Sequence, residues 1–293
     1  MSSATGPVLP RRRLATALKK LRADAELTLD EVAEALMISR SKLSRLENAQ
    51  GSPQARDVRD LVTLYKQEGT PLGDQLMRWV RAARRQGWWL DYAYTSAGTM
   101  TDVDMYLAYE SEASIAKVYT IPFIPSLVQT PDYTRSLYQS LEPWRAREEV
   151  DQLVQLRSKR QLLLTDREEL PPLQLIAVAH ECCLRQLVGS PEIMRAQLLD
   201  LDRWYGPDSP VDLRILPFTA PPAFTSTCMF AHFEFGDALD RDVVHIETHA
   251  GFRSIEIDSQ VATYRRHYDD LFRRALPAAG SRELLRAAAQ SWH

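Results

Sequence analysis

The sequence predicts an α+β protein: an N-terminal all-α helix-turn-helix domain followed by a mixed, mainly antiparallel sheet domain with packed helices. Three observations predict this fold class. Apolar residues recur at helical spacing between residues 14 and 65, and four apolar runs of strand length lie in the second half. Helical segments separate or follow these runs, as they do when helices pack on a sheet.

The first two helices are predicted by their apolar spacing and by a start signal. An apolar stripe at i, i+3, i+4 and i+7 is formed by Leu14, Ala17, Leu18 and Leu21. Thr28 is the expected N-cap of the second helix, and Glu31 completes a capping box. Leu27 and Val32 are spaced for the hydrophobic staple that accompanies such a cap.

The third and fourth helices follow at short intervals. Ser39 is the expected N-cap of the third helix, with Ile38 and Leu43 as its staple. Gly51 can take the left-handed conformation after that helix. We expect Ser52 to cap the fourth helix, with a proline in its first turn.

These signals divide the chain into four segments. We expect a disordered arm over residues 1–10, a DNA-binding helix-turn-helix domain over 11–70, a linking helix over 71–95, and a partner- or ligand-binding domain over 96–293. In the last segment we expect a helix over 103–118 and another capped by Ser190. Strands are expected at 173–180, 211–218, 228–235 and 242–249.

The third helix carries the clearest chemical signal in the chain. If Leu43 and Leu46 point inward, the arginines and serines at positions 40, 41, 44 and 45 fall on the outer face, with Lys42 on its flank. Arginine can fork onto the O6 and N7 of guanine, serine can hold a phosphate, and lysine supplies charge. In a helix-turn-helix, the second helix enters the major groove of DNA.

The charge distribution agrees with a nucleic-acid module joined to a non-binding body. Residues 1–85 contain 16 Lys and Arg against 10 Asp and Glu, whereas the remainder contains 20 against 29. The net charge of −3 is therefore the sum of a basic N-terminal part and an acidic remainder.

Residues 14–65 resemble the helix-turn-helix of the xenobiotic-response-element family, the Cro and phage-repressor type. The resemblance rests on "LTLDEVAEALMISRSKLSRLENAQGSP" and the following "VRDLVTLY". It implies a structural role for Glu47, and it places Met37 where the turn usually has glycine. The expected DNA contacts are Thr28, Ser39, Arg40, Ser41, Lys42, Ser44 and Arg45.

Most of the remaining chain resembles the uncharacterised C-terminal domain of WhiJ-like transcriptional regulators. The segments "IPSLVQTPDYTRSL", "HECCLRQLVGSPEIMRAQLLDL", "VDLRILPF", "FAHFEFGD" and "VVHIE" carry this resemblance. Ser126 replaces a usual glycine, and His245 replaces a usual tyrosine. The resemblance implies a body that binds a partner or receives a signal, and these regulators are often described as antitoxin-like and encoded beside a very small protein.

Two groups of residues could suggest an enzyme or a metal site. His245, Glu247 and His249 alternate in a strand-like run, so they would share one face, and His180 beside Glu181 could be an acid–base pair. We expect neither. A metal would need a further ligand, and His180 with Glu181 more simply ends a strand and caps the next helix. The chain has no G-x-S-x-G, P-loop or dinucleotide motif, so we expect no catalytic residues, metal or cofactor.

A weaker candidate site lies in "SLVQTPDY", where prolines interrupt the helices. We expect Gln129, Thr130 and Asp132 to be exposed there as a ligand or partner surface. The aromatic and proline-rich stretches "YTIPFIPSLVQT" and "PFTAPPAFTSTCMF" could line a pocket, although such residues also form ordinary core.

Together these patterns predict a cytoplasmic, sequence-specific transcriptional regulator that binds a double-stranded DNA operator as a homodimer. The chain has no apolar run long enough to span a membrane, and we expect no secretory signal. The C-terminal domain is expected to receive a signal, with a small protein as the favoured partner. The alternatives are an antitoxin-like protein that neutralises a small partner and autoregulates, and a regulator that responds to a small molecule.

Overall fold

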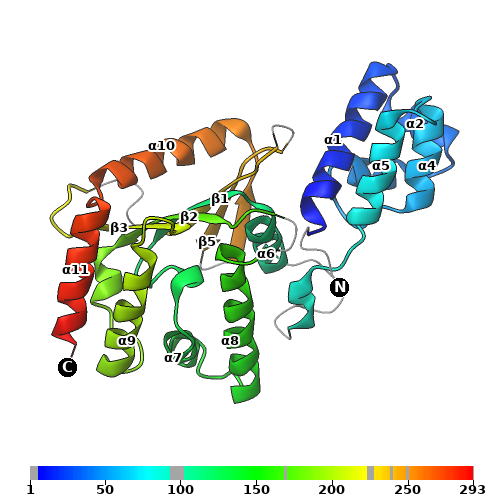
Figure 1. Cartoon of the computed structure of the whole chain (residues 1–293). Helices are drawn as coiled ribbons and strands as arrows, with labels where there is room; N and C mark the ends of the chain where they lie inside the picture. The colour runs from blue at the N-terminus through cyan, green and yellow to red at the C-terminus, as the bar shows by residue number, and fades with distance from the viewer. Residues whose placement is uncertain are drawn as a thin grey trace. The chain divides into compact units, whose positions relative to one another are not determined.

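Two units make up the structure, a computed structural model that describes residues 6–92, 102–167, 170–222, 228–237, 240–248 and 251–292. The first unit comprises the chain up to Trp88 together with Asp237 and Asp240, and the second unit comprises the rest. The first unit is helical and the second combines a sheet with helices (Figure 1). The predicted α+β class, with the all-α part first, is therefore confirmed.

Short helices with tight connections build the first unit. They are α1 (Val8–Asp24), α2 (Leu29–Ala35), α3 (Arg40–Glu47), α4 (Ala55–Leu64) and α5 (Pro71–Ala82). The 3-10 helix η1 (Trp88–Asp91) spans the boundary with the second unit. Helix α1 begins inside the segment expected to be a disordered arm, and residues 1–5 lie outside the described residues. Helix α4 begins at Ala55 with Gln54 at its N-cap position, so the expected cap at Ser52 is wrong.

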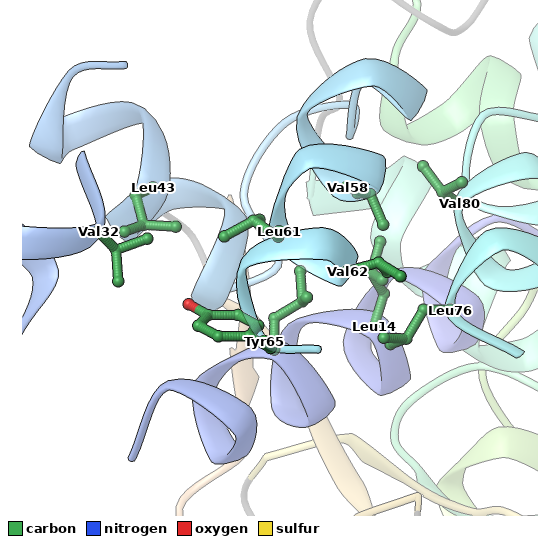
Figure 2. Close-up of a cluster of buried hydrophobic side chains, with 10 residues drawn as sticks. Leu14, Val32, Leu43, Val58, Leu61, Val62, Tyr65, Leu76 and Val80 are labelled. Atoms are coloured by element: carbon green, nitrogen blue, oxygen red, sulfur yellow. The ribbon is translucent and has the colours of Figure 1, made fainter. Parts of the chain in front are cut away.

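The core of the first unit gathers one apolar face from each of its helices (Figure 2). Leu14, Val32, Leu43 and Leu61 are fully buried there. Helix α5 adds two more buried residues at positions 76 and 80, so it is part of this core as well as the last helix before the boundary. Each buried leucine contributes about 1.5–3 kcal/mol of transfer free energy, which fixes α3 to the other helices.

The second unit alternates helices and strands along the chain. Its elements are α6 (Asp102–Glu112), β1 (Ile115–Thr120), η2 (Ser126–Val128), α7 (Pro131–Leu141), α8 (Arg147–Gln161), η3 (Leu162–Leu164), β2 (Gln174–His180), η4 (Glu181–Leu184), α9 (Pro191–Leu201), η5 (Asp202–Trp204), β3 (Val211–Leu216), β4 (Phe230–Glu234), β5 (Val243–Thr248), β6 (Gly251–Ile255), α10 (Asp258–Arg274) and α11 (Ala278–Ser291). The cap at Ser190 is confirmed, since its hydroxyl accepts the Ile193 amide.

The strands form one six-stranded sheet in the order β3-β2-β1-β4-β5-β6. Strand β1 is parallel to β2, and β2 is parallel to β3, whereas the pairs β1–β4, β4–β5 and β5–β6 are antiparallel. This is the predicted mixed, mainly antiparallel sheet. Strands β1 and β6 were not among the predicted strands, and the start of β1 lies in residues expected to be helical.

The two faces of the sheet bury different groups. Tyr119, Phe230 and Val244 pack against Tyr268 and Leu271 of α10, which runs along one face (Figure 1). Because side chains alternate along a strand, residues next to these point to the opposite face. Helices α7, α8 and α9 lie on that opposite side of the sheet in Figure 1.

Candidate nucleic-acid interface

The capping box predicted at Thr28 begins α2. The Thr28 hydroxyl accepts the Glu31 amide at 3.2 Å, and the Glu31 carboxylate accepts the Thr28 amide at 2.7 Å and its hydroxyl at 2.8 Å. These hydrogen bonds hold the pKa of Glu31 below its ordinary value. Thr28 is exposed, so it is both a structural cap and accessible to a phosphate.

The turn between α2 and α3 takes the conformation usual for glycine. Met37 has a φ of 52°, in the left-handed region, and 93% of its surface is exposed. The turn is therefore of the usual shape despite the missing glycine. Ser39 then begins α3 as predicted, with its hydroxyl accepting the Lys42 amide at 3.2 Å.

Helix α3 has one buried face and one exposed face. Leu43 is fully buried and Leu46 is partly buried against the same core. The predicted contact residues lie on the exposed side, where all are exposed except Ser44, which is half-buried; they are Ser39, Arg40, Ser41, Lys42, Ser44 and Arg45. The structure therefore confirms which side chains of α3 the sequence predicted to point into the core and which to point outward.

Two basic side chains of this face already contact carboxylates on neighbouring helices. Arg40 Nε lies 3.3 Å from Asp30 of α2, and both side chains are highly exposed. Lys42 Nζ lies 2.7 Å from Asp57 of α4, whose side chain is only 12% exposed. The exposed Arg40 pair contributes little in water, so Arg40 can exchange its partner for a phosphate or base oxygen. Lys42 is held more firmly, because leaving it would unpair the largely buried Asp57 carboxylate.

The guanidinium of Arg45 lies over Gly51, directly after the helix. Gly51 has a φ of 78°, as the sequence predicted for a left-handed turn. A Cβ built there would lie 3.0 Å from Arg45 Nη2, closer than ordinary van der Waals contact. Gly51 is therefore suited to its position both by its backbone conformation and by the space that Arg45 occupies.

A buried ion pair fixes the C-terminal end of α3. Arg22 of α1 donates from Nε and Nη2 to the Glu47 carboxylate at 2.8 and 2.9 Å, and from Nη1 to the Leu27 carbonyl at 2.9 Å. The Glu47 side chain is 3% exposed. Its hydrogen bonds raise the pKa of Arg22. The structural role implied for Glu47 agrees with this geometry.

Several residues of this interface did not stand out in the sequence. Asp30 and Asp57 belong to α2 and α4, and only the packing of the helices brings them to α3. Asn48 donates from Nδ2 to the Ser44 carbonyl at 2.8 Å and approaches its hydroxyl at 3.3 Å. The spacing of Asn48 four residues after Ser44 on a helix was a signal that could have found this contact.

The weaker site predicted in the second unit is only partly exposed. Gln129 is 3% exposed, so its expected exposure is wrong. Its amide donates to the Ile124 carbonyl at 2.7 Å and accepts from Thr134 and Arg157. Thr130 is half-buried and caps α7, while Asp132 is exposed. The loop is held by the buried amide of Gln129, which the prolines in the sequence did not reveal.

The rival enzyme and metal residues have structural partners. His245 and Glu247 line the same cavity, as their alternation predicted, and His249 lies outside the described residues. His180 ends β2 and caps η4, its Nδ1 accepting the Cys182 amide at 3.2 Å. Glu181 instead accepts the Phe218 amide at 2.9 Å, so its expected capping role is wrong.

One cluster in the second unit has the composition of a metal site. The ligand atoms of His232, Glu234 and Asp242 lie within 4.8 Å of one another. Each carboxylate already pairs with a cation, however, because Lys117 lies 2.6 Å from Glu234 and Arg265 lies 2.6 Å from Asp242. The cluster is thus a charge network between strands and α10, not an open ligand set.

Comparisons with known protein families match both units. A helix-turn-helix domain family matches residues 13–74, which include the whole of α2, α3 and α4. The first unit is therefore a helix-turn-helix domain, the kind of domain found in DNA-binding regulators. No curated protein and no solved structure matched the chain. Among the described residues, every helix is too short or too polar to cross a membrane.

The second match covers most of the second unit. A family model described as a domain of unknown function (DUF5753) matches residues 103–287, more than half of the chain. These residues run from α6 into α11 and so include the entire sheet. The chain belongs to the family of proteins that carry this domain of unknown function (DUF5753).

Proposed function

We propose that this protein is a sequence-specific, DNA-binding transcriptional regulator of the xenobiotic-response-element type. The observation that carries the proposal is the outer face of α3. Arg40, Ser41 and Arg45 are exposed there, while Leu43 anchors the opposite side of the helix in the core. Long donors on a rigid helix are what base recognition in the major groove requires.

We further propose that the protein acts in the cytoplasm and binds its operator as a homodimer. A helix-turn-helix dimer places its two recognition helices in half-sites about one helical turn apart, roughly 34–36 Å. A single short helix reads few base pairs, so two copies supply the length of operator that specificity needs. The acidic second unit would supply the dimer contacts.

We propose that the second unit receives the signal. The expected small protein partner and the antitoxin-like role rest on the resemblance to WhiJ-like regulators and stay predictions. The alternative, a small-molecule signal, is favoured by a cavity of about 290 Å³ between the sheet and α7 and α8. The three alternatives share one architecture, in which a change in the second unit alters DNA binding by the first.

The groove assignment is tested by selecting an operator from random duplexes with the full-length protein. Arg40→Ala and Arg45→Ala should then each lose about 1–3 kcal/mol of discrimination between the operator and unrelated DNA, because a forked guanine contact is removed. Fluorescence anisotropy measures this loss, and circular dichroism checks that the fold is unchanged. Arg78→Ala, an exposed arginine on α5, is the matched control. The assignment fails if both variants bind every duplex as the wild type does.

The regulator and antitoxin alternatives are separated in the native host. Deleting this gene alone should change transcription from its operator without killing cells if the protein is a regulator. Cell death that is rescued by removing a neighbouring reading frame would favour the antitoxin alternative. Affinity purification from the same host would then identify what accompanies the second unit.

A further inference from the structure

A cavity in the second unit lies between the sheet and the loop and helices that follow β1. Its volume is about 290 Å³, close to the lower limit of about 300 Å³ for small-molecule sites. Thr120, Ala231 and His245 come from three adjacent strands and line its floor. The opposite wall contains aliphatic and aromatic side chains from the loop after β1 and from α7 and α8, so most of the lining is apolar.

A buried ion pair holds the walls of this cavity in place. Arg160 of α8 donates from Nε and Nη2 to the Glu110 carboxylate of α6 at 2.6 and 2.7 Å, and from Nη2 to the Ser126 hydroxyl at 2.9 Å. Both charged side chains are less than a tenth exposed. The three groups tie two helices and the loop together, so the cavity is a preformed space and not a gap between loosely packed elements.

Two polar groups of the lining have hydrogen-bonding capacity to spare. Thr120 is 4% exposed, and among the described residues its buried hydroxyl has only the Cys183 thiol beside it, which is a weak hydrogen-bond acceptor. Arg157 Nε is buried without a hydrogen-bond partner in the described part of the chain, although Arg157 donates from its other nitrogens to Gln129 and to the Tyr138 hydroxyl. Buried donors without a partner are rare because they are costly, and a frequent explanation is a ligand or an ordered water.

The charges around the cavity balance. Arg157 and Arg160 face Glu142 and Glu247, and Glu142 already pairs with Arg145. Burial raises the pKa of Glu247, and the nearby Arg157 opposes that rise. A lining without excess charge gives no advantage to a charged ligand, which would have to lose its hydration on entry.

We propose that this cavity binds a small, mostly apolar, uncharged molecule that carries an acceptor oxygen of the carbonyl type. The apolar walls take its hydrocarbon part, and the oxygen accepts hydrogen bonds from the Thr120 hydroxyl and Arg157 Nε. The inference deepens the proposed signal-receiving role of the second unit. It is tested by binding without DNA, so failure of the groove assignment leaves it untouched.

The test uses four probes that share one phenylbutyl skeleton: 4-phenylbutan-2-one, n-butylbenzene, 4-phenylbutylamine and 4-phenylbutanoate. Thermal unfolding and calorimetric titration of the full-length protein measure their binding. The ketone should bind at least fivefold more tightly than each of the other three. Equal binding of all four, no binding at millimolar concentration, or tightest binding of the acid or the amine would overturn the proposal.

Two variants test the residues named. Thr120→Val keeps the shape of the side chain and should weaken ketone binding at least fivefold while leaving hydrocarbon binding and the unfolding temperature of the free protein unreduced. Thr134→Val is the matched contrast, because its hydroxyl donates to Gln129 and its loss should lower that temperature. Ala231→Leu should fill the cavity and abolish binding of every probe. Wild-type ketone affinity in Thr120→Val overturns the proposal even if Ala231→Leu does not fold.

Discussion

Replacing His245 by phenylalanine should remove a defined part of the acid sensitivity of the second unit. His245 lies on β5, is 2% exposed, and has a pKa lowered to about 4 because burial disfavours its charged form. Its ring meets Tyr106 edge to face with centroids 4.9 Å apart, and its Nδ1 lies 3.2 Å from the Ser254 hydroxyl. A phenyl ring keeps the edge-to-face contact with Tyr106 but cannot bind a proton.

The magnitude follows from the difference between the folded and unfolded pKa values. The unfolded chain binds a proton at His245 near pH 6.5, and the folded chain binds it only near pH 4. The stability due to the neutral ring is therefore fully present above pH 6.5, falls between pH 6.5 and 4, and falls no further below that. The difference corresponds to about 3 kcal/mol at 1.36 kcal/mol per pKa unit.

Urea unfolding of the full-length protein at pH 7, 5.5 and 4 measures this effect, followed through the transition of the second unit. The wild type should lose about 3 kcal/mol more than His245→Phe between pH 7 and 4. Ser254→Ala is the matched control, because it removes the hydroxyl beside Nδ1 and keeps the titrating ring. Parallel losses in the wild type and His245→Phe, or an imidazole that titrates near pH 6.5 by NMR, would refute the reasoning.

Three further predictions concern the first unit. Asp57→Asn should free Lys42 from its ion pair and raise the affinity of the protein for all duplexes alike. In anisotropy titrations, the slope of log K against log salt should steepen by about 0.9, which is the effect of one added phosphate contact. Glu47→Gln should lower the free energy of unfolding by about 1–3 kcal/mol in urea, because the partly buried Arg22 loses its charged partner. A fragment of residues 1–88 should fold and bind DNA more weakly than the full chain. A fragment ending at residue 75 should show no cooperative thermal unfolding, because it lacks the buried Leu76 and Val80 of α5.

Each of these predictions has a control variant and a result that would contradict it. Asp60→Asn, also on α4, pairs with Arg56 instead of α3 and should leave the salt dependence unchanged. Glu34→Gln changes an exposed carboxylate and should leave stability unchanged. An unaltered salt slope in Asp57→Asn, wild-type stability in Glu47→Gln, or full operator affinity in the 1–88 fragment would contradict the respective reasoning.

The helix-turn-helix was predictable because its signals are local. The caps at Thr28 and Ser39 act over three residues, and the buried stripe of α3 repeats every three to four residues. The turn at Met37 could be placed, but its left-handed conformation could not be derived from a residue that rarely adopts it. Pro53 after Ser52 looked like a helix start, yet α4 begins two residues later.

The sheet and the cavity depend on contacts between distant residues, and the sequence predicted them less well. Strand β1 follows α6 after only two residues, so the helical pattern concealed it. Gln129 stands between prolines in a segment that looked exposed, but its amide is buried by hydrogen bonds to the loop, α7 and α8. The position of the Thr120 hydroxyl in the cavity lining has no sequence signal, since any threonine at a strand end looks alike.

The contact between Arg45 and Gly51 bears on how such a regulator can diverge. A side chain at Gly51 would displace the guanidinium of Arg45, which is one of the proposed base-contacting groups. The recognition helix would keep its sequence, and yet the preferred operator would shift. On the proposed function, a single change in the loop after α3 would therefore alter operator preference without any change in the helix itself.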